Sequence, residues 1–186
     1  MAKLSSICQM IGLKGGFLLL AMVLLVACQS NSRYTSKAEL DRYGVSPAKA
    51  RELERHLAKR HIKIIRVGED YLISLPNSRL FYGPSPRIQW EAYRDLNLIA
   101  EYLHQFSKIT VMVVGHTDDA QTEDRNLALS RARAQNIADY LWSQNIDTRV
   151  LKAKGQGSQN PIATNVVAQG RADNQRVEII FRKLMV

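Results

Sequence analysis

The chain has 186 residues, of which 46% are hydrophobic and 23% are charged, as is typical of a globular protein with one ordinary domain and some additional segments. Its 26 lysines and arginines outnumber its 17 aspartates and glutamates, so the formal net charge is +9 at pH 7. The sequence contains no internal repeat and no low-complexity segment, which excludes repeat architectures and collagen-like or linker-like chains.

Residues 1–27 are typical of a secretory signal peptide. Lys3 and Lys14 precede an apolar run at residues 17–27, and no acidic residue lies before that run. The run is too short for a spanning helix, which needs roughly 20 apolar residues. Export from the cytoplasm argues against nucleic acid as a partner. The basic charge therefore favours the anionic cell wall and lipid headgroups.

The signal peptide ends in Leu25-Val26-Ala27-Cys28, which resembles the lipobox at which bacterial lipoproteins are cleaved. The resemblance implies that Cys28 becomes the lipidated N-terminus, and that Gln29, in place of an aspartate, directs the protein to the outer membrane. Ordinary signal cleavage and an uncleaved anchor are the alternatives. Cys8 would leave with the signal peptide, so we expect no disulfide in the mature chain.

Residues 28–45 are polar and without period, which predicts a flexible tether. Ser46 and Pro47 then provide an N-cap and a proline at the first helical position, so we expect a helix over residues 46–61. Leu53 and Leu57 are its predicted buried positions.

The remaining residues, 62–186, alternate between strand and helix patterns. Residues 62–67 and 71–75 predict a hairpin closed by Pro76 and Asn77. Helical spacing of apolar residues predicts helices over 87–106, beginning near Ile88, and over 123–144. The buried face of the second helix is expected to contain Leu127, Ala134, Ile137, Ala138 and Leu141.

Three further strands are expected, at residues 109–114, 149–153 and 177–181. The near-continuous apolar character of residues 109–114 predicts an inner strand covered on both faces. The order strand, helix, strand, helix, strand, strand predicts an α/β (α+β) sandwich, in which helices pack on a mixed sheet.

Polar residues with a fixed spacing follow the strand at residues 109–114. Gly115-His116-Thr117-Asp118 lies where this strand ends, a common position for a binding site. Residues 126–134 have the sequence NLALSRARA, which places Asn126, Ser130 and Arg133 one turn apart on the next helix. A third segment, GRADNQRVE at residues 170–178, leads into the final strand.

These segments together resemble the OmpA-like peptidoglycan-binding domain of OmpA, Pal and MotB proteins, over roughly residues 62–183. The resemblance implies that Asp118 and Arg133 bind the diaminopimelate of the peptide stem, with Thr117, Asn126, Arg171 and Arg176 in supporting roles. The chemistry suits this assignment. A diaminopimelate side chain ends in an ammonium and a carboxylate. The carboxylate of Asp118 can accept hydrogen bonds from this ammonium, and the guanidinium of Arg133 can donate two hydrogen bonds to the ligand carboxylate.

The chain departs from the family pattern at two positions, because Gln121 replaces a frequent glycine and Gln175 replaces an arginine. An alternative interpretation makes Asp118 a helix cap and Arg133 a member of a surface ion pair. Asn126 could serve packing alone, and Arg176 could be structural.

An enzyme is a further alternative, because His116 and Asp118 lie near other acidic residues. The region has a single histidine and no H-E-x-x-H motif, and Ser130 lacks a G-x-S-x-G turn. We therefore expect no enzymatic activity, no metal and no cofactor.

The sequence thus predicts a non-enzymatic outer-membrane lipoprotein that binds peptidoglycan and tethers the membrane, or an envelope machine, to the wall. The layout of the chain also resembles small OmpA-like lipoproteins of type IVB (Dot/Icm) secretion systems. In that alternative the protein acts mainly through protein contacts, with residues 46–75 touching a secretion-system partner.

Overall fold

The computed structural model describes residues 46–106, 109–147 and 149–183, all of which lie in the compact unit Leu40–Val186. The predicted signal peptide, the lipidation site Cys28 and the tether lie outside the described residues. Within the described ranges, no helix combines the length and the apolar character needed to cross a membrane.

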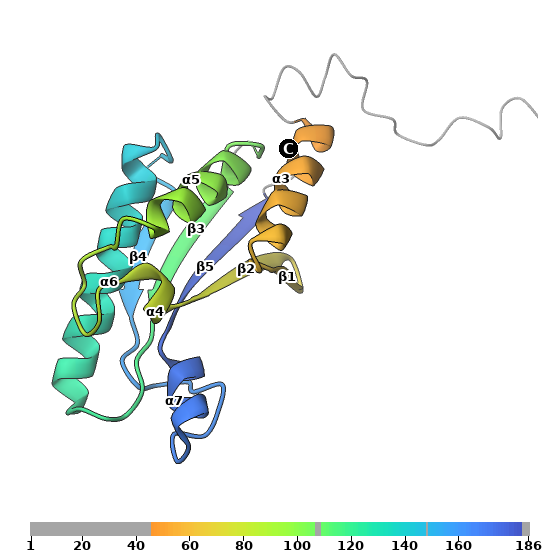
Figure 1. Cartoon of the computed structure of the whole chain (residues 1–186). Coiled ribbons are helices and arrows are strands. Elements are labelled where there is room, and N and C mark those ends of the chain that lie inside the picture. The colour runs from red at the N-terminus through yellow and green to blue at the C-terminus, as the bar shows by residue number, and fades with distance from the viewer. Residues whose placement is uncertain (1–45, 107–108, 148, 184–186) are drawn as a thin grey trace, which may run out of the picture. The chain divides into compact units, whose positions relative to one another are not determined.

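A five-stranded mixed sheet forms the centre of the domain, with strand order β1-β2-β5-β3-β4 (Figure 1). All neighbours are antiparallel except β3 and β4, which are parallel. The predicted mixed sheet with helices packed on it is therefore confirmed. The strands are β1 (Ile64–Val67), β2 (Asp70–Pro76), β3 (Ile109–Gly115), β4 (Leu151–Gly155) and β5 (Arg176–Lys183).

Figure 1 shows the three longer helices on the same side of this sheet. They are α3 (Pro47–Lys59), α5 (Ala92–Leu103) and α6 (Glu123–Ser143). Of two short helices, α4 (Asn77–Leu80) follows the end of β2 and α7 (Ala168–Asn174) precedes the start of β5. Along β5, Val177, Ile179 and Phe181 are buried beneath the helices, while Ile180 is half-buried on the other face. This period of two is expected for a sheet with one covered face.

The N-terminal helix α3 is docked onto the domain by the residues that its sequence pattern predicted. Ser46 accepts a hydrogen bond from the backbone N of Lys49 (3.3 Å), which caps the helix. Leu53 and Leu57 are fully buried, and α3 contacts α5. The apolar side of α3 is therefore used within this chain.

Three expectations about the elements were wrong. The helix expected from residue 87 begins at Ala92, and Ile88 instead forms an isolated β-bridge with Phe81. Backbone bonds across the loop, such as Gln89 N to Leu80 O (2.9 Å), satisfy groups that a helix would have used. Leu127 is 44% exposed, because the buried face of α6 starts one residue earlier, at Asn126. Met112 is 40% exposed whereas Val114, on the same face of β3, is 4% exposed, so the second face of β3 is only partly covered.

Candidate functional site

The ends of β2 and β3 and the start of β5 lie side by side at one end of the sheet, and this end is called the site edge below. In the register, Pro76 at the end of β2 is opposite Arg176 at the start of β5, and Gly115 at the end of β3 is opposite Val177. Two backbone hydrogen bonds extend the pairing past the strand ends. Asn77 N donates to Gln175 O (2.8 Å), and His116 N donates to Arg176 O (2.9 Å). The topology therefore gathers residues 77–78, 116–118 and 174–175, which are far apart in the sequence.

Glycines let α6 lie directly against this edge. A Cβ at Gly115 would be 2.2 Å from the backbone O of Ser130, and one at Gly155 would be 2.4 Å from the backbone N of Arg131. The Ser130 hydroxyl accepts a hydrogen bond from Gly157 N (2.9 Å) and donates one to Leu127 O (3.0 Å). Gly115 and Ser130 thus mark the place where the backbone of α6 packs closely against the end of β3.

Asp118 is almost buried and is held by hydrogen bonds to both carboxylate oxygens. Oδ1 accepts from the backbone N of Ala120 (3.2 Å), and Oδ2 accepts from Nε2 of Gln175 (2.7 Å). Since α6 begins at Glu123 and its N-cap position is Thr122, Asp118 does not cap this helix. The helix-cap alternative is therefore wrong.

A pocket of about 220 Å³ opens beside Asp118. Its other lining residues come from α4 and from α7 with its C-cap residue, namely Ser78, Ala168, Arg171, Ala172 and Gln175. Nη1 of Arg171 donates to the carbonyl oxygens of Asn165 (2.8 Å) and Val166 (3.1 Å), which fixes α7 against the preceding loop. The structure thus places one predicted supporting residue, Arg171, in the pocket of Asp118.

Arg133 is buried, so the alternative of a surface ion pair is wrong. It donates from Nη2 to Gly83 O (2.8 Å) and from Nε to Ser85 O (3.3 Å), and its guanidinium lies 5.1 Å from the ring centroid of Phe81. Burial lowers the pKa of Arg133, while the charge of Asp118 acts in the opposite direction. The hydrogen bonds of Arg133 thus go to the loop at residues 81–91 and not to Asp118.

The other predicted supporting residues have structural contacts. Asn126 donates from Nδ2 to Gln121 O (3.0 Å), which closes the loop after Asp118. Nε of Arg176 donates to Oε1 of Glu178 (2.7 Å). The backbone N of Thr117 donates to Gly157 O (2.8 Å).

Buried polar atoms gather next to Asp118. Nδ2 of Asn77 donates to His116 O (3.0 Å), whereas Oδ1 of Asn77 and Oγ1 of Thr117 are buried without a hydrogen-bond partner in the described part of the chain. Both atoms can accept hydrogen bonds. They belong to residues at the same strand ends as Asp118, although neither residue lines its pocket.

His116 lies behind this edge, with Nε2 3.6 Å from Oε2 of Glu178. The contact with His116 and the ion pair with Arg176 lower the pKa of Glu178, against the burial that raises it. Across the described ranges, no three histidine, cysteine, aspartate or glutamate side chains form a group that could hold a metal ion.

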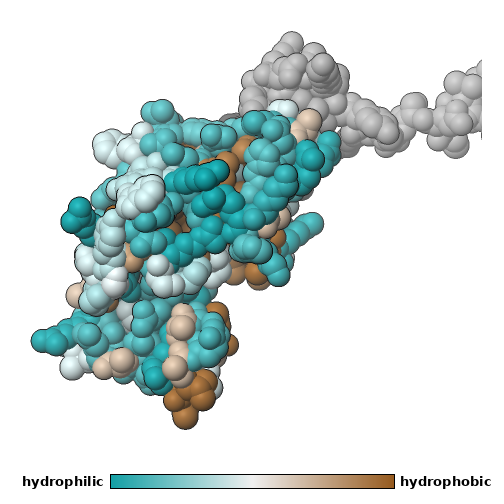
Figure 2. Space-filling model, viewed as in Figure 1, coloured by the Kyte–Doolittle hydropathy of each residue, from teal (hydrophilic) through white to brown (hydrophobic). Residues whose placement is uncertain are grey.

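Sequence reasoning missed several residues that build the site. Gln175 appeared only as a departure from a family pattern, but it binds Asp118 directly. Asn174 is fully buried and its Oδ1 accepts from the backbone N of Ile162 (2.8 Å) and of Ala163 (3.0 Å), which shapes the loop before α7. Its place in the GRADNQRVE segment was the available signal. Figure 2 shows brown, hydrophobic residues at the α7 end of the domain, where Ile162, Val166 and Val167 are exposed.

Comparisons with known proteins agree with this architecture. Residues 80–175 match the model of the OmpA family. The chain is 33% identical over 123 residues to a probable lipoprotein, YiaD, of Escherichia coli, covering 66% of this chain and 56% of the relative. It is 40% identical over 88 residues to the peptidoglycan-binding protein ArfA of Mycobacterium tuberculosis, covering 47% of this chain and 27% of that protein.

Among solved structures, the cell wall anchor of the T6SS from Pseudomonas aeruginosa superposes with a TM-score of 0.65 at 32% identity. The match covers 73% of this chain and 96% of that one. The chain spans about half, or less, of the length of the first curated relatives that it matches.

Proposed function

This chain belongs to the OmpA family, and we propose that it is a non-enzymatic lipoprotein of the cell envelope that binds peptidoglycan. Two relatives support the proposal by name, a peptidoglycan-binding protein and a cell wall anchor. The observation that carries it is the small pocket that Asp118, whose carboxylate is nearly buried, lines together with Arg171.

The ligand we propose is the diaminopimelate of the peptide stem. Its ammonium would bind the carboxylate of Asp118 in this pocket. Its carboxylate would bind Arg133, whose Nη1 has no acceptor within the residues that the structure describes, or Arg171 in the pocket. The opposite charges on the two ends of one ligand explain why a site needs both a carboxylate and a guanidinium.

The expected affinity is modest but sufficient. Hydrogen bonds to charged groups contribute roughly 1.5–3 kcal/mol each, so two of them give an affinity between several millimolar and about tens of micromolar. A membrane-anchored domain facing many copies of the stem rebinds at high effective concentration. We propose that this anchor is a lipid on Cys28 in the outer membrane, an expectation to which the name of the Escherichia coli relative lends support.

Sedimentation with purified sacculi tests the wall-binding proposal. Asp118→Asn keeps the shape of the side chain and removes its charge, so we expect a roughly 10- to 100-fold loss of affinity. Asp119→Asn is the matched control, because Asp119 is exposed, adjacent and equal in charge but does not line the pocket. Equal retention of both variants would refute a role for Asp118, and retention of Arg171→Gln at the wild-type level would remove Arg171 from the site.

A second candidate function is to attach a secretion machine to the wall, and the likeness to the T6SS cell wall anchor favours it. The predicted membership of a type IVB (Dot/Icm) complex is one form of this proposal. The buried side of α3 faces α5, so a partner would contact its exposed face, for example at Arg55. A photo-crosslinker at position 55 should capture an envelope protein in intact cells, and capture of peptidoglycan alone would refute the partner.

A further inference from the structure

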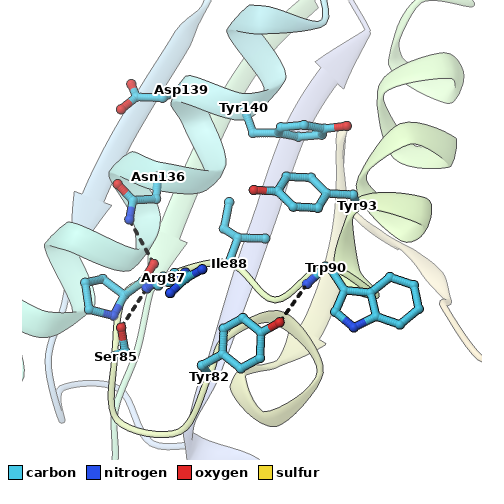
Figure 3. A pocket seen from close by; sticks show the side chains of 10 residues that line it. Tyr82, Ser85, Arg87, Ile88, Trp90, Tyr93, Asn136, Asp139 and Tyr140 are labelled. Carbon is cyan, nitrogen blue, oxygen red and sulfur yellow. Dashed lines mark hydrogen bonds between the residues drawn. The ribbon is translucent and has the colours of Figure 1, made fainter.

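An aromatic groove lies outside the proposed stem-peptide pocket. It opens between α5, α6 and the loop at residues 81–91, and has a volume of about 570 Å³ (Figure 3). This lies within the roughly 300–1,000 Å³ that is usual for ligand sites. Four aromatic side chains line it, from Tyr82, Trp90, Tyr93 and Tyr140.

Three of the four rings, those of Tyr82, Trp90 and Tyr93, are exposed to solvent, whereas Tyr140 is half-buried against the core. Trp90 is 72% exposed, although its backbone N is held by the hydroxyl of Tyr82 (3.5 Å). Tyr93 is 40% exposed, and its ring centroid lies 5.0 Å from that of Tyr140 at an interplanar angle of 56°. Tyr140 is fixed in turn by a hydrogen bond from its hydroxyl to Asn97. Large exposed rings on a supported surface are typical of a recognition site.

The charges in the groove balance. Arg87 lies 5.5 Å from the ring centroid of Tyr82, and Oδ1 of Asp139 accepts from Nε2 of Gln135 (2.7 Å). The remaining polar lining groups, such as the amide of Asn136, are uncharged. A groove with one cation and one anion fits a neutral ligand better than a phosphate or an acidic peptide. That ligand must offer a flat apolar face to the rings and hydrogen-bond donors to the carboxylate.

From this chemistry we propose that the groove binds a glycan of β-1,4-linked N-acetylated amino sugars. The C–H face of such a sugar ring stacks on an aromatic ring, its hydroxyls donate to a carboxylate such as that of Asp139, and its acetamide pairs with an amide such as that of Asn136. A proline-rich segment also suits aromatic grooves, but it offers carbonyl acceptors and few donors, so it would leave Asp139 unmatched.

The loop that lines the groove is held by α6 next to Arg133, the other residue proposed to bind the stem peptide. Asn136 donates from Nδ2 to Pro86 O (2.8 Å), one turn along α6 from Arg133, which binds the carbonyls of Gly83 and Ser85. From Arg133 to Tyr140 the helix advances about 10 Å. The identity of the glycan as the wall backbone rests on the proposed function, whereas sugar binding by the groove does not.

Titration of the full chain with tri-N-acetylchitotriose tests the inference, because this trimer is neutral and carries no stem peptide. The chain has two tryptophans, so the Trp142→Phe variant leaves Trp90 as the single tryptophan reporter. We expect a saturable change in its emission and a matching heat of binding by calorimetry. Trp90→Ala and Tyr93→Ala should each weaken the calorimetric affinity at least tenfold. Trp142→Ala, which removes a 59% exposed tryptophan outside the groove, should leave it unchanged.

The outcomes separate this inference from the proposed function. Asp118→Asn should bind the trimer as the wild type does, even if the same variant loses sacculi. Unchanged emission and no heat at trimer concentrations up to about 10 mM, where a millimolar site would be largely occupied, would overturn the sugar assignment. Binding of a proline-rich peptide that depends on Trp90, without binding of the trimer, would overturn it in favour of a protein partner.

Discussion

Asp95 joins three helices through one buried carboxylate. Its Oδ1 accepts from Nε of Arg60 at the end of α3, and its Oδ2 accepts from Nε of Arg79 in α4 (2.5 Å). Nη1 of Arg79 also donates to Arg60 O (2.8 Å). The Asp95 side chain is 2% exposed, and those of Arg60 and Arg79 are 29% and 28% exposed. We predict that Asp95→Asn weakens the fold through loss of this charge.

The magnitude follows from the burial of the three groups. Removing one partner of a buried ion pair costs about 3–5 kcal/mol, because a charge stays behind without compensation. The two arginines retain some contact with water, so we expect the lower end, about 3 kcal/mol. This is a large part of the 5–15 kcal/mol that is typical of whole domains. It corresponds to a fall in Tm of roughly 6–12 °C.

Urea denaturation followed by circular dichroism at pH 7 measures the change, with Asp173→Asn as the control. Asp173 is an exposed carboxylate on α7 that accepts from Gln169 (2.9 Å), and its substitution should stay within about 0.5 kcal/mol of the wild type. A free energy of unfolding for Asp95→Asn within the same range would refute the reasoning that the charge of Asp95 holds α3 on the domain.

Three further predictions concern the site. Gly115→Ala would place a Cβ 2.2 Å from Ser130 O, so we expect a loss of at least about 1–3 kcal/mol by thermal denaturation; an unchanged Tm would contradict the close contact. Because the pKa of Glu178 is lowered in the folded state, its ionised carboxylate stabilises the fold at pH values above the ordinary pKa of 4.5, and this stability is lost as the pH falls through the folded pKa. Glu178→Gln should therefore make the free energy of unfolding depend less steeply on pH at acid pH. An unchanged slope would contradict this. Arg133→Lys cannot bond Gly83 and Ser85 together as a guanidinium does, so hydrogen exchange should speed up at amides of residues 81–91; unchanged protection would show that the loop is held by other groups.

The sheet and the long helices were predictable because their signals are local. Alternating apolar residues in β2 and β5 and helical spacing in α6 each reflect one buried face. The start of α5 was not predictable from the same pattern. Residues 80–89 include Pro84 and Pro86, and their backbone groups bond across the loop, as Tyr82 N does to Arg87 O (3.1 Å). Such a choice depends on the folded surroundings and not on spacing.

The positions of Asp118 and Arg133 could be predicted, but their orientations could not. Arg133 points to the carbonyls of Gly83 and Ser85, which lie about 50 residues earlier in the chain. The aromatic groove likewise combines residues from two helices and a loop, and no single stretch of sequence contains its pattern. Family resemblance supplies residue types at motif positions, whereas contacts between distant segments decide which groups face a ligand.

Gln175 illustrates this difference, since its meaning changes once its contact is known. An arginine at this position would place a permanent positive charge against Oδ2 of Asp118, and a ligand ammonium would have to compete with it. The amide of Gln175 instead donates one neutral hydrogen bond, which orients the carboxylate and leaves its negative charge uncompensated at that oxygen. Arg171 lines the other part of the same pocket, so a zwitterion would meet separate negative and positive groups. The departure from the family pattern is therefore compatible with the proposed binding of an ammonium at Asp118.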